Sequence, residues 1–123
     1  MAGISKSLNS VESLLSAYGN GKRYFVECEL DECSLKNVNL SGATFLKCFM
    51  SFDFQGANLT GVRFKECNLK MATFRNAILK DAVITNCSVE SIDFKEANIE
   101  NLKFENNYSM GVLLNQDDLS SFC

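Results

Sequence analysis

A large apolar residue recurs every five residues from Leu30 to Phe104, and this period restricts the possible folds more than any other feature of the chain. A smaller apolar residue lies two positions before each large one, and most of the remaining positions are polar. A period of five matches neither an amphipathic helix nor a continuously alternating strand. One step, from Met50 to Phe54, is four residues long. The large positions are Leu30, Leu35, Leu40, Phe45, Met50, Phe54, Leu59, Phe64, Leu69, Phe74, Leu79, Ile84, Val89, Phe94, Ile99 and Phe104.

Each apolar-x-apolar triplet predicts a very short strand whose two apolar ends point inward. The two or three residues after each triplet must turn a corner, and if every corner is a right angle, four units close a square coil of about twenty residues. Successive coils then stack at the interstrand spacing of about 4.8 Å, and chain chirality favours right-handed winding. The sequence therefore predicts an all-β solenoid, a right-handed quadrilateral β-helix of about four coils.

Residues four units apart should lie above one another in such a solenoid, and they show chemical regularity. The intervals between successive cysteines in the first of these columns are 20, 19 and 20 residues, so the column independently locates the short step between Met50 and Phe54. We expect these cysteines and phenylalanines to form a structural core ladder. The two most regular columns are Cys28, Cys48, Cys67 and Cys87, and Leu35, Phe54, Phe74 and Phe94.

The repeating unit resembles that of the pentapeptide repeat family, which is written Ala-(Asn/Asp)-Leu-x-x. Residues 57–59 (Ala-Asn-Leu) and 97–99 (Ala-Asn-Ile) show the resemblance, which covers residues 28–106. The departures are cysteines at five small positions and the shortened unit at 48–51. Residues 11–25 look like the leader of many bacterial, and especially cyanobacterial, members. The resemblance implies a right-handed quadrilateral β-helix.

Both ends of the repeat need caps, because a β-helix otherwise exposes an apolar cross-section and unpaired strand edges. Residues 1–27 predict an N-terminal capping helix and lead-in, which a Gly-Asn-Gly stop signal at 19–21 ends. A partner-binding or membrane-surface helix is the alternative, but a single Lys6 gives no basic face. The repeat spans 28–106, and 107–123 predicts a C-terminal cap or a homodimer seam, two compatible roles. The apolar positions at helical spacing are Ile4, Leu8, Val11, Leu14, Leu15 and Tyr18.

The composition excludes several classes of function. The chain has no histidine, which removes Ser-His-Asp and Cys-His catalysis and histidine metal ligation. The formal net charge of −3 argues against nucleic-acid binding by bulk positive charge. No apolar run is long enough for a membrane span and no signal peptide is recognisable, so the cytoplasm is the expected compartment. We expect neither an enzyme nor a bound cofactor.

Six cysteines raise the question of a metal or redox site. Tetrahedral zinc needs four sulfurs at about 2.3 Å from the ion, whereas the cysteine column spreads its four thiols along about 14 Å of axis. Parallel side chains in register also leave the Cβ atoms wider apart than the mean of about 3.8 Å in disulfides. We therefore predict no metal site in the column, and buried thiols that act as small hydrophobes.

Four apolar residues fall at positions that should point outward. Leu46 and Phe49 flank the corner into the second coil, while Ile78 and Val83 flank a corner inside the third. Because a solenoid wall should be polar, either the terminal segments or a partner must cover these residues. We take the four as a candidate partner patch.

The sequence predicts a non-enzymatic protein-interaction or scaffold module whose partner is another protein of unknown identity. Most members of the family that it resembles have no assigned activity. Some resemble duplex DNA in diameter and charge and protect or inhibit DNA gyrase, so a DNA-mimicking gyrase or topoisomerase modulator is the alternative. The outward acidic residues that such mimicry would use are Glu29, Asp31, Glu32 and Glu90, opposed on the same face by Lys70.

Overall fold

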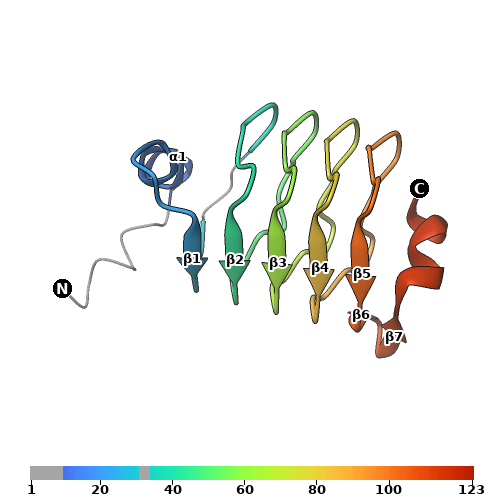
Figure 1. Ribbon diagram of the computed structural model, residues 1–123. Helices are drawn as coiled ribbons and strands as arrows, with labels where there is room; N and C mark the ends of the chain where they lie inside the picture. The colour runs from blue at the N-terminus through green and yellow to red at the C-terminus, as the bar shows by residue number, and fades with distance from the viewer. Residues whose placement is uncertain (1–9, 31–33) are drawn as a thin grey trace.

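The computed structural model describes residues 10–30 and 34–123. A short helix, α1 (Val11–Gly19), precedes five short parallel strands that stack into one sheet in chain order (Figure 1). A hairpin and a 3-10 helix follow the last of them. The strands are β1 (Tyr24–Val26), β2 (Thr44–Leu46), β3 (Arg63–Lys65), β4 (Val83–Thr85) and β5 (Lys103–Glu105), and the C-terminal elements are β6 (Asn107–Ser109), β7 (Val112–Leu114) and η2 (Gln116–Phe122). The predicted β-solenoid of about four coils with an N-terminal helix is confirmed.

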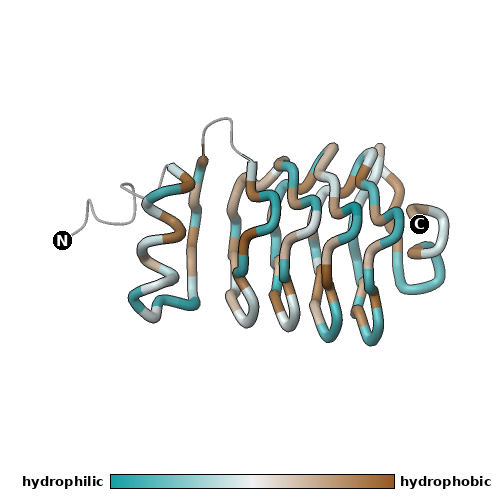
Figure 2. Tube along the Cα trace, turned by 90° about the horizontal axis from the view of Figure 1, so that it is seen from above, coloured by the Kyte–Doolittle hydropathy of each residue, from teal (hydrophilic) through white to brown (hydrophobic). Residues whose placement is uncertain are grey.

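The sheet forms one wall of the solenoid, and isolated parallel β-bridges form the other three. The first strand, β1, lies within the range predicted as lead-in, so the stack begins before Cys28. Polar and apolar residues alternate along every coil (Figure 2). Around each coil the chain passes the sheet wall (β1–β5), the Cys wall (bridging residues Glu29, Phe49, Asn68, Ser88 and Tyr108), the Phe wall (Ser34, Asp53, Thr73 and Asp93) and the Asn wall (Asn39, Asn58, Ile78 and Asn98).

The polar residue at many bridging positions has a structural role at the corner that follows it. At eight bridging positions of the three bridge walls, the side-chain oxygen accepts a hydrogen bond from the backbone N–H two residues later. Such Asx-type and Ser/Thr-type turns hold the chain in the bend that the next wall requires. The eight are Ser34, Asn39, Asp53, Asn58, Asn68, Thr73, Asp93 and Asn98.

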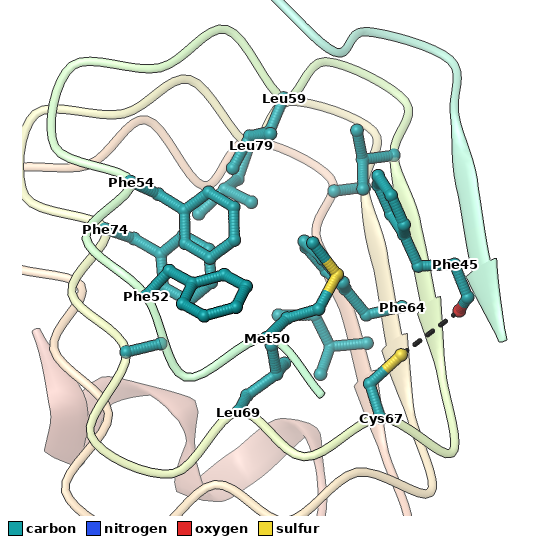
Figure 3. Packing of buried hydrophobic residues seen from close by; sticks show 14 of the residues in the cluster. Phe45, Met50, Phe52, Phe54, Leu59, Phe64, Cys67, Leu69, Phe74 and Leu79 are labelled. Atoms are coloured by element: carbon teal, nitrogen blue, oxygen red, sulfur yellow. Dashed lines mark hydrogen bonds between the residues drawn. The ribbon is translucent and has the colours of Figure 1, made fainter. Parts of the chain in front are cut away.

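The core consists of the inward columns, and stacked aromatic rings run through it (Figure 3). Along the Phe wall the ring centroids of Phe54 and Phe74 lie 4.9 Å apart with an interplanar angle of 5°, and Phe74 stacks on Phe94 at 5.4 Å. Phe52, which takes a normally small position in the shortened unit, is also buried and lies 6.3 Å from Phe54. Burial of the apolar side chains in these columns is the main source of stability. Each coil contacts only its neighbours, so the stability of a coil depends on the packing between adjacent coils.

Apolar burial closes the N-terminal end. The Ser10 side chain caps α1 by accepting the Ser13 N–H at 3.1 Å, and Leu14 is completely buried in the core cluster. The Tyr18 hydroxyl donates to the Ser41 carbonyl at 2.7 Å, which ties the helix to the first coil. Ile4 and Leu8, part of the predicted helical pattern, lie outside the described residues.

Hydrogen bonds to the last coil help to close the C-terminal end. The Gln116 side chain accepts the Phe104 N–H through Oε1 and donates to the Leu102 carbonyl through Nε2, both at 2.9 Å. It replaces the peptide group that another coil would supply. The Phe94 N–H donates to the Phe122 carbonyl at 3.0 Å, and Leu119 is buried, so η2 covers part of the open cross-section.

Candidate interaction surfaces

The four predicted patch residues form two separate pairs. Leu46 on β2 and Phe49 flank the corner between the sheet wall and the Cys wall. Ile78 lies on the Asn wall and Val83 lies on β4, so the two residues flank the corner between the Asn wall and the sheet wall. Because Phe49 and Ile78 belong to opposite walls, no single patch contains all four residues.

Phe49 and Ile78 differ from their partners in exposure and in turn chemistry. Their relative exposures are 50% and 40%, whereas Leu46 and Val83 are partly buried. Both occupy bridging positions; on the Asn wall Asn39, Asn58 and Asn98 cap the turn that follows, and on the Cys wall Asn68 does so. An apolar side chain has no oxygen to offer, so these two units lack a local hydrogen bond and expose apolar surface instead. Folding alone therefore does not account for Phe49 and Ile78.

The four thiols of the cysteine column are free and buried in the apolar core cluster, and those of Cys48, Cys67 and Cys87 also make weak hydrogen bonds to the backbone. Cys67 Sγ donates to the Phe45 carbonyl at 3.2 Å (Figure 3), and Cys87 Sγ donates to the Phe64 carbonyl at 3.3 Å. The Cys67 N–H in turn donates to Cys87 Sγ at 3.4 Å. The thiols thus bridge adjacent coils through weak hydrogen bonds.

Asn107 continues this column in the position of a fifth cysteine. Its Oδ1 accepts the Cys87 N–H at 2.9 Å and its Nδ2 donates to the Ile84 carbonyl at 3.0 Å. The amide makes the same two kinds of bond as the thiols of Cys48 and Cys87, which each accept a backbone N–H from the preceding coil and donate to a carbonyl. Asn107 is completely buried, and both of its partners are main-chain groups.

Three of the buried thiols, those of Cys28, Cys48 and Cys67, have raised pKa values and are poor nucleophiles. For Cys48, the interaction with Cys28 lowers the pKa, but the hydrogen bond with Cys67 and burial outweigh it and raise the pKa to about 12. For Cys67, the contact with Cys48 lowers the pKa, while Cys87 and burial raise it to about 12. Hydrogen bonding with Cys48 and burial also raise the pKa of Cys28. These thiols are protonated at neutral pH and unsuited to covalent or redox chemistry.

Of the four acidic residues considered for DNA mimicry, the structure describes Glu29 and Glu90, and these two do not form an acidic stripe. Glu29 is exposed, and Glu90 pairs with Lys70 at 3.7 Å, which compensates its charge. Asp31 and Glu32 lie outside the described residues. Over 10–30 and 34–123, no group of three or more His, Cys, Asp or Glu side chains is arranged to hold a metal ion. No helix in the same ranges is long and apolar enough to cross a membrane.

The C-terminal hairpin exposes apolar residues of the segment 107–123, for which the sequence predicts a cap or a homodimer seam. Tyr108, Met110, Val112 and Leu113 have relative exposures of 47%, 83%, 57% and 50%. The capping part of the segment is η2, together with the partly buried Leu114. The apolar composition of 107–123 indicated burial, but it could not separate the residues that face the core from those that do not.

Comparisons with known proteins agree on the type of repeat. A family model described as the pentapeptide repeat region matches residues 57–121. Over 66 residues the chain is 38% identical to the quinolone resistance pentapeptide repeat protein QnrB96 of Scandinavium goeteborgense. The aligned segment covers 49% of this chain and 29% of that protein. The solved structure of QnrB1, a plasmid-mediated fluoroquinolone resistance protein, matches with a TM-score of 0.58 and 26% identity over 70% of this chain and 45% of that one. A pentapeptide repeat protein from Nostoc Pcc 7120 gives a TM-score of 0.48 and 27% identity over 93% and 94% of the two chains. The chain thus spans less than half the length of the two Qnr proteins.

Proposed function

Because the chain belongs to the pentapeptide repeat family, we propose that it is a non-enzymatic protein-interaction or scaffold module that binds another protein through the corner formed by Leu46 and Phe49. The observation that supports this proposal best is Phe49, a half-exposed aromatic side chain at a position where other units have a turn-capping polar residue. Buried aromatic anchors dominate the energetics of many protein interfaces. We also propose a cytoplasmic location, since all five described cysteines are free thiols.

The Leu46 and Phe49 corner is a better candidate than the Ile78 and Val83 corner. Phe49 offers a larger, more exposed apolar surface than Ile78. Leu46 lies beside Val26 in the parallel register of β1 and β2, so the apolar surface extends across two strands. Val83, in contrast, lies between Arg63 and Lys103 in the register of the sheet.

Affinity capture from the native host with the wild-type protein and two single variants tests the proposal. Phe49→Ser removes the proposed anchor and provides a hydroxyl that can cap the turn, while Ile78→Ser makes the same change on the opposite wall. A specific partner should be lost with Phe49→Ser and retained with Ile78→Ser, with both variants folded. Equal retention by both variants would rule out the Phe49 corner as the binding site.

A DNA-mimicking modulator of gyrase is the second candidate, and the 38% identity to a quinolone resistance protein favours it. Such mimicry works through an extended negative potential and is therefore sensitive to salt. Four coils span only about 19 Å, and one of the two described acidic candidates, Glu90, is paired with a lysine. We expect neither inhibition of supercoiling nor protection from quinolones at micromolar protein. Inhibition that disappears in the Glu29→Lys/Glu32→Lys double variant would establish this candidate instead.

A further inference from the structure

Within residues 10–30 and 34–123, no strand pairs with the outer edge of β7 in the C-terminal hairpin. Tyr108 bonds the preceding coil through both of its main-chain groups: its N–H donates to the Cys87 carbonyl at 2.8 Å, and its carbonyl accepts the Val89 N–H at 2.8 Å. Tyr108 lies opposite Leu113 in the antiparallel pair of β6 and β7. A residue whose N–H and C=O both face the other neighbour makes a non-hydrogen-bonded pair across the ladder. The N–H and C=O of Leu113 therefore both point away from β6.

The hairpin keeps this edge in a fixed, extended form. β6 and β7 are joined by Met110 and Gly111, whose φ values of 50° and 80° suit a two-residue type I′ turn. The hairpin is attached to the solenoid through Tyr108 and through the buried side chain of Asn107. An edge held in this way offers one donor and one acceptor to an incoming strand at little cost in conformational entropy.

The side chains around the edge define the chemistry of its occupant. Residues 106–116 contain no charged residue, and Tyr108 and Leu113 share one face of the hairpin because they lie directly opposite each other. Asp117 and Asp118 lie in the first turn of the adjacent η2, which has no basic residue in its last turn, and the Asp118 carboxylate also accepts the Asn115 N–H at 2.9 Å. An uncharged apolar run flanked by a Lys or Arg would complement both features.

We propose that the edge of β7 binds an extended segment of a partner protein, which adds to the hairpin as a further strand, places apolar side chains over Tyr108 and Leu113, and directs a basic residue toward η2. Strand addition of this kind combines main-chain hydrogen bonds with side-chain selectivity. A second copy of the chain fits less well. In Figure 1, η2 extends beyond β7 along the stacking direction. A second copy paired at this edge would therefore bring two acidic η2 segments together, whereas a single partner strand would lie beside one η2 segment only.

Two variants at one position separate the backbone from the side chain. Leu113→Pro removes the outward N–H, and proline is tolerated on an edge strand where that group faces solvent. Leu113→Val retains the N–H and an apolar side chain, which becomes β-branched and suits a strand. The hairpin's own bonds use Asn107, Ser109, Val112 and Leu114, so neither substitution removes a donor that the fold uses. Thermal unfolding of both variants checks that the hairpin is intact, and a double variant with Phe49→Ser shows whether this edge is independent of the proposed Phe49 corner.

The probe is a phage-displayed library of random peptides of about ten residues, selected on the wild-type protein, with the enriched peptides then synthesised and measured by fluorescence polarisation. We expect enrichment of uncharged, β-branched runs next to a Lys or Arg, with affinity about tenfold lower or weaker for Leu113→Pro and within about threefold for Leu113→Val. No enrichment, or equal binding to wild type and Leu113→Pro, would overturn the proposal. Sedimentation that shows a dimer of the wild type and a monomer of Leu113→Pro would also overturn it, because the edge would then belong to a second copy.

Discussion

Both ends of the solenoid combine apolar burial with hydrogen bonds, but different elements provide them. At the N-terminal end α1 buries Leu14 in the core, and the Tyr18 hydroxyl is fixed to the first coil. At the C-terminal end Gln116 provides a side-chain amide in place of the next coil's peptide group, and the hairpin continues the stack by one short pair of strands. At the C-terminal end, the outer edge of β7 carries the N–H and C=O of Leu113, which point away from β6 and can pair with a further strand.

The largest effect on this comparison should come from Leu14→Ala. The substitution removes most of a completely buried side chain, so we expect the free energy of unfolding to fall by about 2–5 kcal/mol. Denaturant unfolding measures the loss, and Ser16→Ala on the exposed side of α1 is the control. Because coils support only their neighbours, thiol labelling of Cys28 should accelerate more than that of Cys87. Equal acceleration at both sites would show that α1 is not a local cap.

A smaller effect is expected from Gln116→Ala at the other end. Losing two hydrogen bonds to the last coil should cost about 1–3 kcal/mol, given about 0.5–1.5 kcal/mol for each bond. Gln116→Glu keeps an acceptor for the Phe104 N–H but loses the donor to Leu102, so its loss should be intermediate. Denaturant unfolding ranks the variants, and Ser120→Ala serves as the exposed control. If alanine and glutamate variants match the wild type, the Gln116 side chain is not part of the cap.

The smallest effect on stability should come from the exposed apolar residues between the two ends. Phe49→Ser and Ile78→Ser each remove a side chain that is at least 40% exposed, so both should change the free energy of unfolding by no more than about 0.5 kcal/mol. Thermal unfolding compares them with Phe74→Ala, which empties a completely buried aromatic site and should cost about 3–5 kcal/mol. A loss near that of Phe74→Ala in either exposed variant would mean that the residue belongs to the core.

The sequence was sufficient to predict the solenoid because the fold repeats its chemistry at fixed intervals. The cysteine spacing located both the walls and the shortened unit, and the cysteines lie in one buried column. The same spacing contains a signal that we did not use: Asn107 lies twenty residues after Cys87 and takes the next position in the column. An apolar-only criterion excluded it, although a buried amide can make the same main-chain bonds as a thiol.

The ends and the surface were harder to predict, because neither repeats. The contacts of Gln116 depend on how η2 folds back over β5, and no periodic pattern encodes that path. The composition of 107–123 predicted a cap or a homodimer seam, but it did not show that the hairpin with its turn at Met110 and Gly111 leaves Tyr108 and Leu113 half-exposed. The division of the candidate patch into two pairs follows from wall geometry. A count of outward apolar residues along the chain does not show it.

Amide hydrogen exchange followed by NMR tests the central comparison most directly, because it measures individual backbone groups at the C-terminal end. The Phe104 N–H donates to Gln116 Oε1, whereas the Leu113 N–H has no acceptor among the described residues. We expect the Leu113 amide to exchange at least about 100-fold faster than that of Phe104. A Leu113 amide as protected as that of Phe104 would contradict the account, because the edge of β7 would then already be paired.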